Sequence, residues 1–526
     1  SELVENIRVS QRYILRRFSM SVVARKRTSF QIDDSRYLTD EQLREFTAKG
    51  FLVLDSELPD AFHSQIFDRL KEVDESIGHF GNNLLPLMPE LQQLLDEPRI
   101  TGALKSILGE KYSFHAHRAL HKNPPGSEEQ EWHKDSYWGY TRRVRNHRPW
   151  WVMLMYFPQD TSVRKGPTGV LEGSQHLVQL LPKRCKQIGA DGKKGYFVLI
   201  HYDVWHRKMK NKTQADRYML KFQFTRLISP TLQANKVART PWRRPKTRPS
   251  LDMNPIWKAN WDWISGNEAI KRKEKNAKLF SASSPRLGKL ICALRAEQEP
   301  EALLAAYELG DLARRGGEGG DVALEGLLNA LESNSTEHEN SRRYSDNGKL
   351  WREDLEARSA AHGLVLAGER AIPGLKQKSI KGNPRARKHA VFALGEIGST
   401  EAHGTLVRAL QDWDVHVRIA AAEAIGLTPV SRRAALGLVK AMKHKESEVR
   451  FDAALSLLRF AAQGKNTDMK VAVPTLIEGL DDSNRYVSAY CAEALERIGT
   501  PEALKGLMPF LRTARWCSHT DNRRPF

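Results

Sequence analysis

Four polar residues of the chain have the types and the spacing that a metal site needs. His133 and Asp135 are separated by one residue in the stretch EQEWHKDSYWG, and His206 follows much further along the chain. Arg217 comes eleven residues after His206, in the stretch WHRKMKNKTQADR. An HxD pair alone is usually structural, so its interpretation depends on the distant histidine and the arginine.

Together these residue types point to one chemistry. Two imidazoles and one carboxylate on one face of a metal ion leave three positions open, which is the facial triad of non-haem Fe(II) oxygenases. The open positions are needed for a bidentate 2-oxo acid and for dioxygen. The distal carboxylate of the 2-oxo acid needs a planar and permanently charged partner, which an arginine provides.

Short strands are the elements expected to position these residues. Alternating apolar and polar residues predict a half-buried strand over 218–227, and Arg217 falls on its polar face with Lys221 and Gln223. Similar runs predict strands over 51–55, 112–120, 151–157 and 196–205. A helix is expected from Thr39 to Gly50. This pattern favours an all-β barrel or jelly roll with a helical flank.

The C-terminal half of the chain is repetitive. Alanine-rich segments begin near Ala357, Ala386, Val417, Val449 and Val487, and in the first four an arginine recurs every 29 to 32 residues. A shorter amphipathic segment precedes each of them. Two short helices per ~30 residues, stacked through their apolar faces, make an α-solenoid, and these repeats resemble the HEAT-like family. We expect the array to start with residues 301–313 and to carry a polar insertion at 333–349.

Composition limits the class of protein. The chain has 83 Lys and Arg against 63 Asp and Glu, and the net charge of +20 favours anionic partners. Its four cysteines are scattered, which argues against a disulfide framework and fits a reducing compartment. No apolar run approaches the ~18 residues that span a bilayer. We expect a cytoplasmic location, with the acid-free stretch 7–27 as either an organelle-targeting leader or a basic arm packed on the first domain.

The chain is expected to have five parts. They are a basic extension (1–30), a β-rich domain (31–230), a basic connector rich in Pro and Trp (231–290), the solenoid (291–515) and a tail (516–526). The connector stretch KVARTPWRRPKTRP is either a nucleic-acid-binding strip or a proline-stiffened linker whose tryptophans pin it to a neighbouring domain. We favour the linker, because base-stacking platforms usually lie on the strands of a folded domain.

The motifs now resemble a known family. An HxD pair, a distant histidine and an arginine eleven residues later are similar to the phytanoyl-CoA dioxygenase (PhyH) family of Fe(II)/2-oxoglutarate-dependent oxygenases. NPPGSEEQEWHKD and WHRKMKNKTQADR match the family's pattern, including Asn211 and Thr213. GPTGVLEGSQH resembles a family segment in which proline usually stands at the position of Glu172. The resemblance covers about residues 35–230 and leaves out the solenoid.

The resemblance implies a fold, a site and a reaction. It implies a double-stranded β-helix (jelly-roll) core in which His133, Asp135 and His206 ligate Fe(II). Arg217 would bind 2-oxoglutarate, and dioxygen would be the second co-substrate. Trp151 falls where some members place a tryptophan near 2-oxoglutarate. Related halogenases lack the carboxylate of Asp135, so its presence implies C–H hydroxylation with release of succinate and CO2; desaturation and ring formation stay open.

Other polar residues near the motifs keep competing interpretations. His201 also lies near a strand end, but the spacing to Arg217 selects His206 as the ligand. His115 and His117 either line the pocket or are buried histidines with satisfied hydrogen bonds. His176 is expected to be a turn residue or to orient a ligand. The basic cluster Arg142, Arg143, Arg145 and Arg148 is either a clamp for an anionic substrate or a solvated loop.

Three functions are compatible with these observations. The first is an Fe(II)/2-oxoglutarate-dependent dioxygenase that hydroxylates an unactivated C–H of a metabolite, with an anionic metabolite as one option, and uses the solenoid as a scaffold or dimerisation surface. The second is the same chemistry on a peptide, protein or nucleic acid recruited by the solenoid. The third is a non-catalytic binding protein with a degenerate oxygenase fold, against which the intact triad and arginine argue. A protein partner is expected before nucleic acid.

Overall fold

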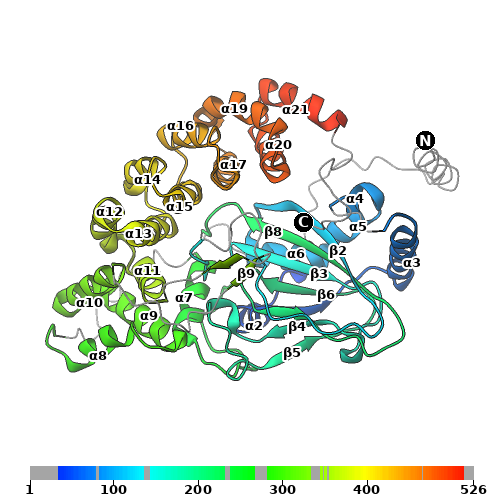
Figure 1. Cartoon of the computed structure of the whole chain (residues 1–526), viewed down its shortest axis with the longest axis horizontal. Coiled ribbons are helices and arrows are strands. Elements are labelled where there is room, and N and C mark those ends of the chain that lie inside the picture. The colour runs from blue at the N-terminus through cyan, green and yellow to red at the C-terminus, as the bar shows by residue number, and fades with distance from the viewer. Residues whose placement is uncertain are drawn as a thin grey trace.

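A β-rich N-terminal domain lies inside a curved array of helices (Figure 1). The computed structural model describes residues 33–78, 82–135, 143–231, 237–266, 281–332, 344–346, 349–351, 355–464 and 466–513. The basic N-terminal stretch 7–27 and the tail 516–526 lie outside these residues. None of the helices in this part of the chain is long and apolar enough to cross a membrane.

Two antiparallel sheets form the centre of the N-terminal domain. One has the strand order β1-β6-β3-β8-β2 and the other the order β5-β4-β7. The strands are β1 (Phe51–Asp55), β2 (Tyr112–Asn123), β3 (Trp151–Tyr156), β4 (Thr168–Leu171), β5 (Gln187–Ala190), β6 (Tyr196–His201), β7 (His206–Lys208) and β8 (Arg217–Arg226). The sheets face each other, since the Thr168 hydroxyl in β4 lies 3.4 Å from Sδ of Met155 in β3. This arrangement is consistent with the expected jelly roll.

The five predicted strands are present, and three short ones were missed. β4, β5 and β7 have only three or four residues, too few for an alternating pattern to be recognised. The strand predicted over 196–205 ends at His201, because the chain turns there and the amide of Val204 donates to the carbonyl of His201 at 3.1 Å. That turn leads directly into β7.

Helices cover the outside of the domain. Thr39 caps α2 in a capping box with Gln42, and Gly50 ends the helix with φ of 83°, a left-handed conformation that favours glycine. The other helices before β2 are η1 (Asp34–Arg36), α3 (Asp60–Ile77), α4 (Leu84–Leu87), α5 (Leu91–Leu95) and α6 (Pro98–Leu108), and α2 itself is Asp40–Lys49. The predicted helix from Thr39 to Gly50 is confirmed.

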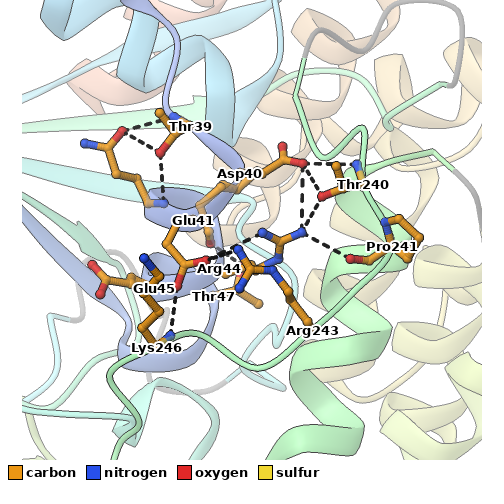
Figure 2. Close-up of polar contacts among 12 residues, drawn as sticks. Thr39, Asp40, Glu41, Arg44, Glu45, Thr47, Thr240, Pro241, Arg243 and Lys246 are labelled. Atoms are coloured by element: carbon orange, nitrogen blue, oxygen red, sulfur yellow. Dashed lines mark hydrogen bonds and ion pairs between the residues drawn. The ribbon is translucent and has the colours of Figure 1, made fainter.

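The connector after β8 packs against α2 (Figure 2). Arg44 of α2 donates to the carbonyl of Pro241 at 3.1 Å, and Arg243 forms an ion pair of 2.8 Å with Glu41. Further along, helix α7 (Asn254–Ile264) buries the tryptophans Trp257, Trp261 and Trp263. These contacts support the linker interpretation, because the three tryptophans are buried within the protein and Arg243 is paired with a carboxylate of α2.

The helical array consists of paired helices, as the repeats predict. The outer helices are α10 (Gly317–Ala330), α12 (Ile372–Lys381), α14 (His403–Ala409), α16 (Arg432–Ala441) and α19 (Val473–Glu478). The inner helices are α9 (Glu299–Arg315), α11 (Leu355–Ala367), α13 (Pro384–Ile397), α15 (Val415–Gly426), α17 (Ser447–Ala462) and α20 (Arg485–Ile498). Helix α8 (Pro285–Ala293) precedes them and α21 (Pro501–Thr513) follows. The short strand β9 (Tyr344–Asp346) lies in the insertion expected at 333–349, and β10 (Lys349–Trp351) begins at its last residue; the rest of the insertion lies outside the described residues.

The inner helices face the N-terminal domain (Figure 1) and bond to it. Hydrogen-bonding pairs that cross this interface are Tyr307–His147 (2.8 Å), His362–Arg145 carbonyl (3.1 Å), Glu396–Trp150 (2.8 Å) and Tyr490–His115 (2.8 Å). The apolar core is also shared, since a single cluster of buried residues includes Trp151 and Leu220 of the sheet together with Phe451 and Leu455 of α17. The concave side of the array is therefore filled by the N-terminal domain.

Candidate metal centre

A short backbone pairing brings the two predicted histidine ligands together. The amide of His133 donates to the carbonyl of His206 at 3.0 Å, and the amide of His206 donates back to His133 at 3.0 Å. Two residues paired in this way lie directly opposite each other in an antiparallel ladder, so their side chains share a face. The ring centroids are 4.5 Å apart.

The donor atoms fit a divalent metal. His133, Asp135 and His206 offer ligand atoms that all lie within 4.8 Å of one another, the one such three-residue group found in the described residues. Nδ1 of His133 lies 3.0 Å from the carbonyl of Glu131, and Nδ1 of His206 lies 3.1 Å from that of Val204. A carbonyl only accepts, so each Nδ1 carries the proton and each Nε2 presents a lone pair to a metal.

Burial favours the protonation states that metal binding needs. Burial, and to a smaller extent the charge of the nearby His133, lowers the pKa of His206 to about 3. Its ring is therefore neutral at physiological pH. Burial alone would raise the pKa of Asp135, but Lys221 and the two histidines hold it well below the usual range. The carboxylate is therefore ionised. Two neutral imidazoles and one carboxylate suit Fe(II).

Lys221, in β8 of the five-stranded sheet, holds the carboxylate of Asp135. Its Nζ donates to Oδ2 of Asp135 at 2.8 Å, while Oδ1 lies 3.8 Å from Nε2 of His206. One oxygen is thus turned toward the ligand group and the other is held by the ammonium. Sequence reasoning placed Lys221 on the polar face of its strand but gave it no role. A lysine in the middle of a buried strand was the available signal.

Arg217 starts β8 and is buried, with 2 % of its surface exposed. Its Nε donates to the carbonyl of Gly166 at 3.0 Å and its Nη1 to that of His121 at 3.3 Å. No carboxylate pairs with it among the residues that the structure describes. Burial lowers the pKa of Arg217 to about 10, so the guanidinium stays charged. A buried cation without a counter-ion is costly, and an anionic ligand would relieve that cost.

The metal centre and Arg217 are connected by side chains on the inner face of β8. Lys221 and Arg217 are four residues apart, which corresponds to roughly 13 Å along a strand. His121 of β2 pairs with Met219, so it lies between them on the same face. Burial and the charge of Lys221 keep the pKa of His121 well below its ordinary value. The strand predicted over 112–120 ended one residue before His121, so the sequence did not mark this histidine as part of the site.

Trp151 lies at the opposite end of the same face. It pairs with Thr225, eight residues beyond Arg217 on β8. Its ring contacts His115 edge-on at 5.4 Å and Tyr202 at 5.9 Å. The structure therefore brings His133, Asp135 and His206 together and places Arg217 on one side of them. It does not bring Trp151 beside Arg217.

The competing histidines occupy other positions. Nδ1 of His201 accepts from the amide of Asp203 at 3.1 Å, and its ring lies 6.3 Å from that of His176. His176 packs against His147, 5.1 Å away, beneath the helical array. His115 and His117 both contact tyrosines of α20. None of the four belongs to the group of ligand atoms around His206.

Three of the arginines after the HxD pair are buried in ion pairs with protein carboxylates. The pairs are Arg143–Asp452 (2.8 Å), Arg145–Asp203 (2.7 Å) and Arg148–Glu396 (3.1 Å). For these three, the substrate clamp and the solvated loop are both wrong. Two of the acidic partners come from the helical array, more than 240 residues away in the chain, where no local charge pattern could reveal them. Arg142 lies outside the described residues.

Known proteins support the same assignment. Residues 34–219 match the family model described as phytanoyl-CoA dioxygenase (PhyH), and residues 372–459 and 435–516 match HEAT repeats. No curated protein matches the chain. The stretch that matches the PhyH model contains His133, Asp135, His206 and Arg217.

Solved structures similar to part of the chain include the following three. The 2-oxoglutarate-dependent carbocyclase SnoK from nogalamycin biosynthesis is 15 % identical, with 36 % of this chain and 85 % of SnoK covered and a TM-score of 0.31. EctD from S. alaskensis with bound Fe is 16 % identical, with coverage of 40 % and 86 % and a TM-score of 0.32. HygX from Streptomyces hygroscopicus with nickel and 2-oxoglutarate is 16 % identical, with coverage of 36 % and 87 % and a TM-score of 0.30. The triad lies within residues 34–219, the stretch that matches the PhyH model, and this supports an oxygenase; the HEAT matches lie within the helical array.

Proposed function

We propose that the protein hydroxylates an unactivated C–H bond of a small-molecule metabolite, with 2-oxoglutarate and dioxygen as co-substrates. The observation that carries the proposal is the placement of His133, Asp135 and His206 on one side and the buried Arg217 on the other. Bound iron and 2-oxoglutarate would supply the oxidising power, with release of succinate and CO2.

The residues of the chain have distinct tasks in this proposal. His133, Asp135 and His206 hold the metal, and the backbone carbonyls behind the histidines fix the orientation of their rings. Lys221 orients Asp135 so that one oxygen faces the metal. Arg217 binds the distal carboxylate of 2-oxoglutarate, and burial strengthens that contact by excluding water.

The packing of the array supports a small substrate. In many solenoids the concave surface binds a protein or nucleic acid. Here the inner helices are bonded to the oxygenase domain instead, through pairs such as Glu396–Trp150 and Asp452–Arg143. A protein partner of the repeats would then meet the outer helices or the loops beside them, such as the loop between α14 and α15, where Trp413 is 72 % exposed.

The test of the proposed function is anaerobic binding of Fe(II) and then 2-oxoglutarate, followed by succinate release in air with a panel of metabolites. We expect micromolar binding of both and succinate formation that rises with the correct substrate. Absence of 2-oxoglutarate binding to the iron-loaded protein would refute the proposal.

Replacing Arg217 should weaken the binding of 2-oxoglutarate without weakening the binding of the metal. Two charge-assisted hydrogen bonds contribute about 3 kcal/mol or more, so Arg217→Ala should raise the 2-oxoglutarate Kd on the order of a hundredfold. The 2-oxoglutarate Kd of Arg217→Lys should lie between those of wild type and Arg217→Ala, since lysine keeps the charge but cannot form the bidentate contact of a guanidinium. Titration of 2-oxoglutarate into Ni(II)-loaded protein measures this, with Ni(II) affinity as the internal control. Equal 2-oxoglutarate affinity in wild type and Arg217→Ala would exclude this role.

Removing the carboxylate of Asp135 should create an anion site. Asp135→Gly opens a metal position and also leaves Lys221 without its partner, so azide or chloride would meet two positive charges. We expect azide to perturb the absorption spectrum of the Co(II)-loaded variant at concentrations that leave wild type unchanged. In the double variant Asp135→Gly/Lys221→Met the azide Kd should rise again. A variant spectrum that ignores azide would show that Asp135 is not a ligand.

A further inference from the structure

The segment 143–148 lies between the metal centre and the HEAT array. It has no regular secondary structure, and every residue in it is buried. Buried backbone groups outside helices and strands need hydrogen-bond partners from other elements. His362 of α11 donates from Nε2 to the carbonyl of Arg145 at 3.1 Å. Asn260 of α7 donates to the carbonyl of His147 at 2.9 Å. The backbone of the segment is thus held by side chains of helices that follow it in the chain.

Three inner helices of the array hold this segment, namely α11, α13 and α17 (Figure 1). One side chain from each of them contacts a different residue of the segment. The contacts are His362–His147 (ring centroids 3.5 Å apart), Glu396–Arg148 (3.1 Å) and Asp452–Arg143 (2.8 Å). Glu423 of α15 adds a second carboxylate 3.7 Å from Arg143. The array therefore neutralises the outer arginines of the segment and fixes its position.

Arg145, in the middle of the same segment, reaches the metal centre. Its Nη1 donates to the carbonyl of Asp135 at 3.1 Å and to Oδ1 of Asp203 at 2.7 Å. Asp203 belongs to the turn that leads to His206, and the next residue, Val204, offers the carbonyl that lies 3.1 Å from Nδ1 of His206. One guanidinium nitrogen thus joins the backbone of the HxD pair to the turn that orients the distant histidine.

This link is shielded from water. The side chains of Arg145 and Asp203 are 0 % and 1 % exposed, so their charge-assisted hydrogen bond is not weakened by solvent. Lys134 also acts on Asp203, and Arg358, which lies near Lys134, is paired with Glu299. Removing Arg145 alone would leave Asp203 buried without this hydrogen-bonded cation, which is costly.

The two contacts of Arg145 restrain what the metal ligands themselves cannot. A metal site works only if its ligands are held within about 0.5 Å of the productive geometry. Lys221 holds the side chain of Asp135, and Arg145 holds its backbone. Because His362 in turn holds the backbone of Arg145, a chain of hydrogen bonds runs from α11 to both ligand-bearing segments.

We propose that Arg145 is a positioning residue of the metal centre, and that the HEAT array, through His362, holds Arg145 where it fixes Asp135 and the turn before His206. The array then shapes the metal site without contributing a ligand. This inference rests on the proposed function, because it takes Asp135 and His206 as metal ligands.

The first test uses full-length protein and Co(II), whose absorption spectrum reports the geometry of its ligands. The double variant Arg145→Met/Asp203→Asn removes the link and both charges of the pair, a change that buried ion pairs often tolerate. We expect a Tm close to that of wild type. The Co(II) Kd should rise about tenfold or more, as for other residues that orient ligands, and the spectrum should change.

The second test addresses the array and compares two replacements of His362. Both remove the ring that stacks on His147, but His362→Gln keeps an amide N–H that can reach the carbonyl of Arg145, and His362→Leu does not. His362→Leu should raise the Co(II) Kd severalfold and change the spectrum as the double variant does. His362→Gln should restore both toward wild type.

The matched control is Tyr490→Phe, which removes a hydrogen bond of 2.8 Å between α20 and His115 of β2. This bond also crosses the interface between domain and array, but it does not involve the segment 143–148. Tyr490→Phe should lower the Tm and leave the Co(II) Kd and spectrum as in wild type.

Each outcome bears on a different claim. Wild-type Co(II) affinity and spectrum in Arg145→Met/Asp203→Asn would overturn the positioning role. If that variant does not fold, the His362 variants decide: a wild-type site in His362→Leu, no rescue by His362→Gln, or an equal effect of Tyr490→Phe would overturn the inference. Failure of wild type to bind Co(II) would instead refute the metal ligands and with them the proposed function.

Discussion

His206→Ala should abolish metal binding and all succinate formation, whereas His201→Ala should retain both. Loss of a partner that merely orients a ligand already costs 10- to 100-fold in metal affinity, so loss of one of three ligands should cost well over 100-fold. His133→Ala should behave like His206→Ala. Anaerobic Fe(II) titration by calorimetry, with succinate release in air, measures the effect.

His201 is the informative control because it is also a buried histidine close to the same turn, five residues from His206. Its Nδ1 accepts from the amide of Asp203 and lies outside the ligand group. Its replacement should therefore lower stability, seen as a lower Tm, and leave the Fe(II) Kd within a few-fold of wild type. An inactive His201→Ala beside an active His206→Ala would reverse the ligand assignment.

Removing the HEAT array should destroy the oxygenase domain as a soluble unit. A fragment that ends near residue 270 would expose Trp150, which is 2 % exposed in the whole protein and contacts Glu396 and Arg459. Exposing one such side chain costs about 5 kcal/mol at ~25 cal/mol per Å2 over about 200 Å2. Small domains are stable by only about 5–15 kcal/mol, and the shared core contains many more such residues.

The fragment is checked by size-exclusion chromatography and by 2-oxoglutarate binding after Fe(II) loading, beside the full-length chain. We expect aggregation, or a soluble fragment without 2-oxoglutarate binding. A monomeric fragment with wild-type binding and coupled turnover would show that the array is dispensable for the site.

The sequence predicted what is encoded locally. The spacing within each pair, His133 with Asp135 and His206 with Arg217, could be read from the sequence, because a short segment of chain connects the two members of each pair. The solenoid followed from its period, because each repeat buries the same apolar positions. Arg217 and Lys221 were placed on one face by simple alternation along β8.

Contacts between distant segments could not be predicted. Arg143 was expected at a pocket mouth, since a sequence displays its charge but not the buried Asp452 that pairs with it. In the same way, nothing near His117 points to Tyr486, 369 positions away. Lys221 lies 2.8 Å from Asp135 because His133, two residues before Asp135, pairs with His206 in the three-stranded sheet that faces β8. The first two of these contacts join the N-terminal domain to the array.

The interface between domain and array also has a consequence for biosynthesis. Its hydrogen bonds join residues as far as 385 positions apart, as between Arg497 and the carbonyl of Tyr112. Such long-range contacts form late and slow folding. On the ribosome the sheets emerge first and wait for α20, with aromatic surface uncovered. The nascent chain therefore depends on protection from aggregation until α20 has been translated, and a site that is completed only then would spare the cell uncoupled oxidation by shorter chains.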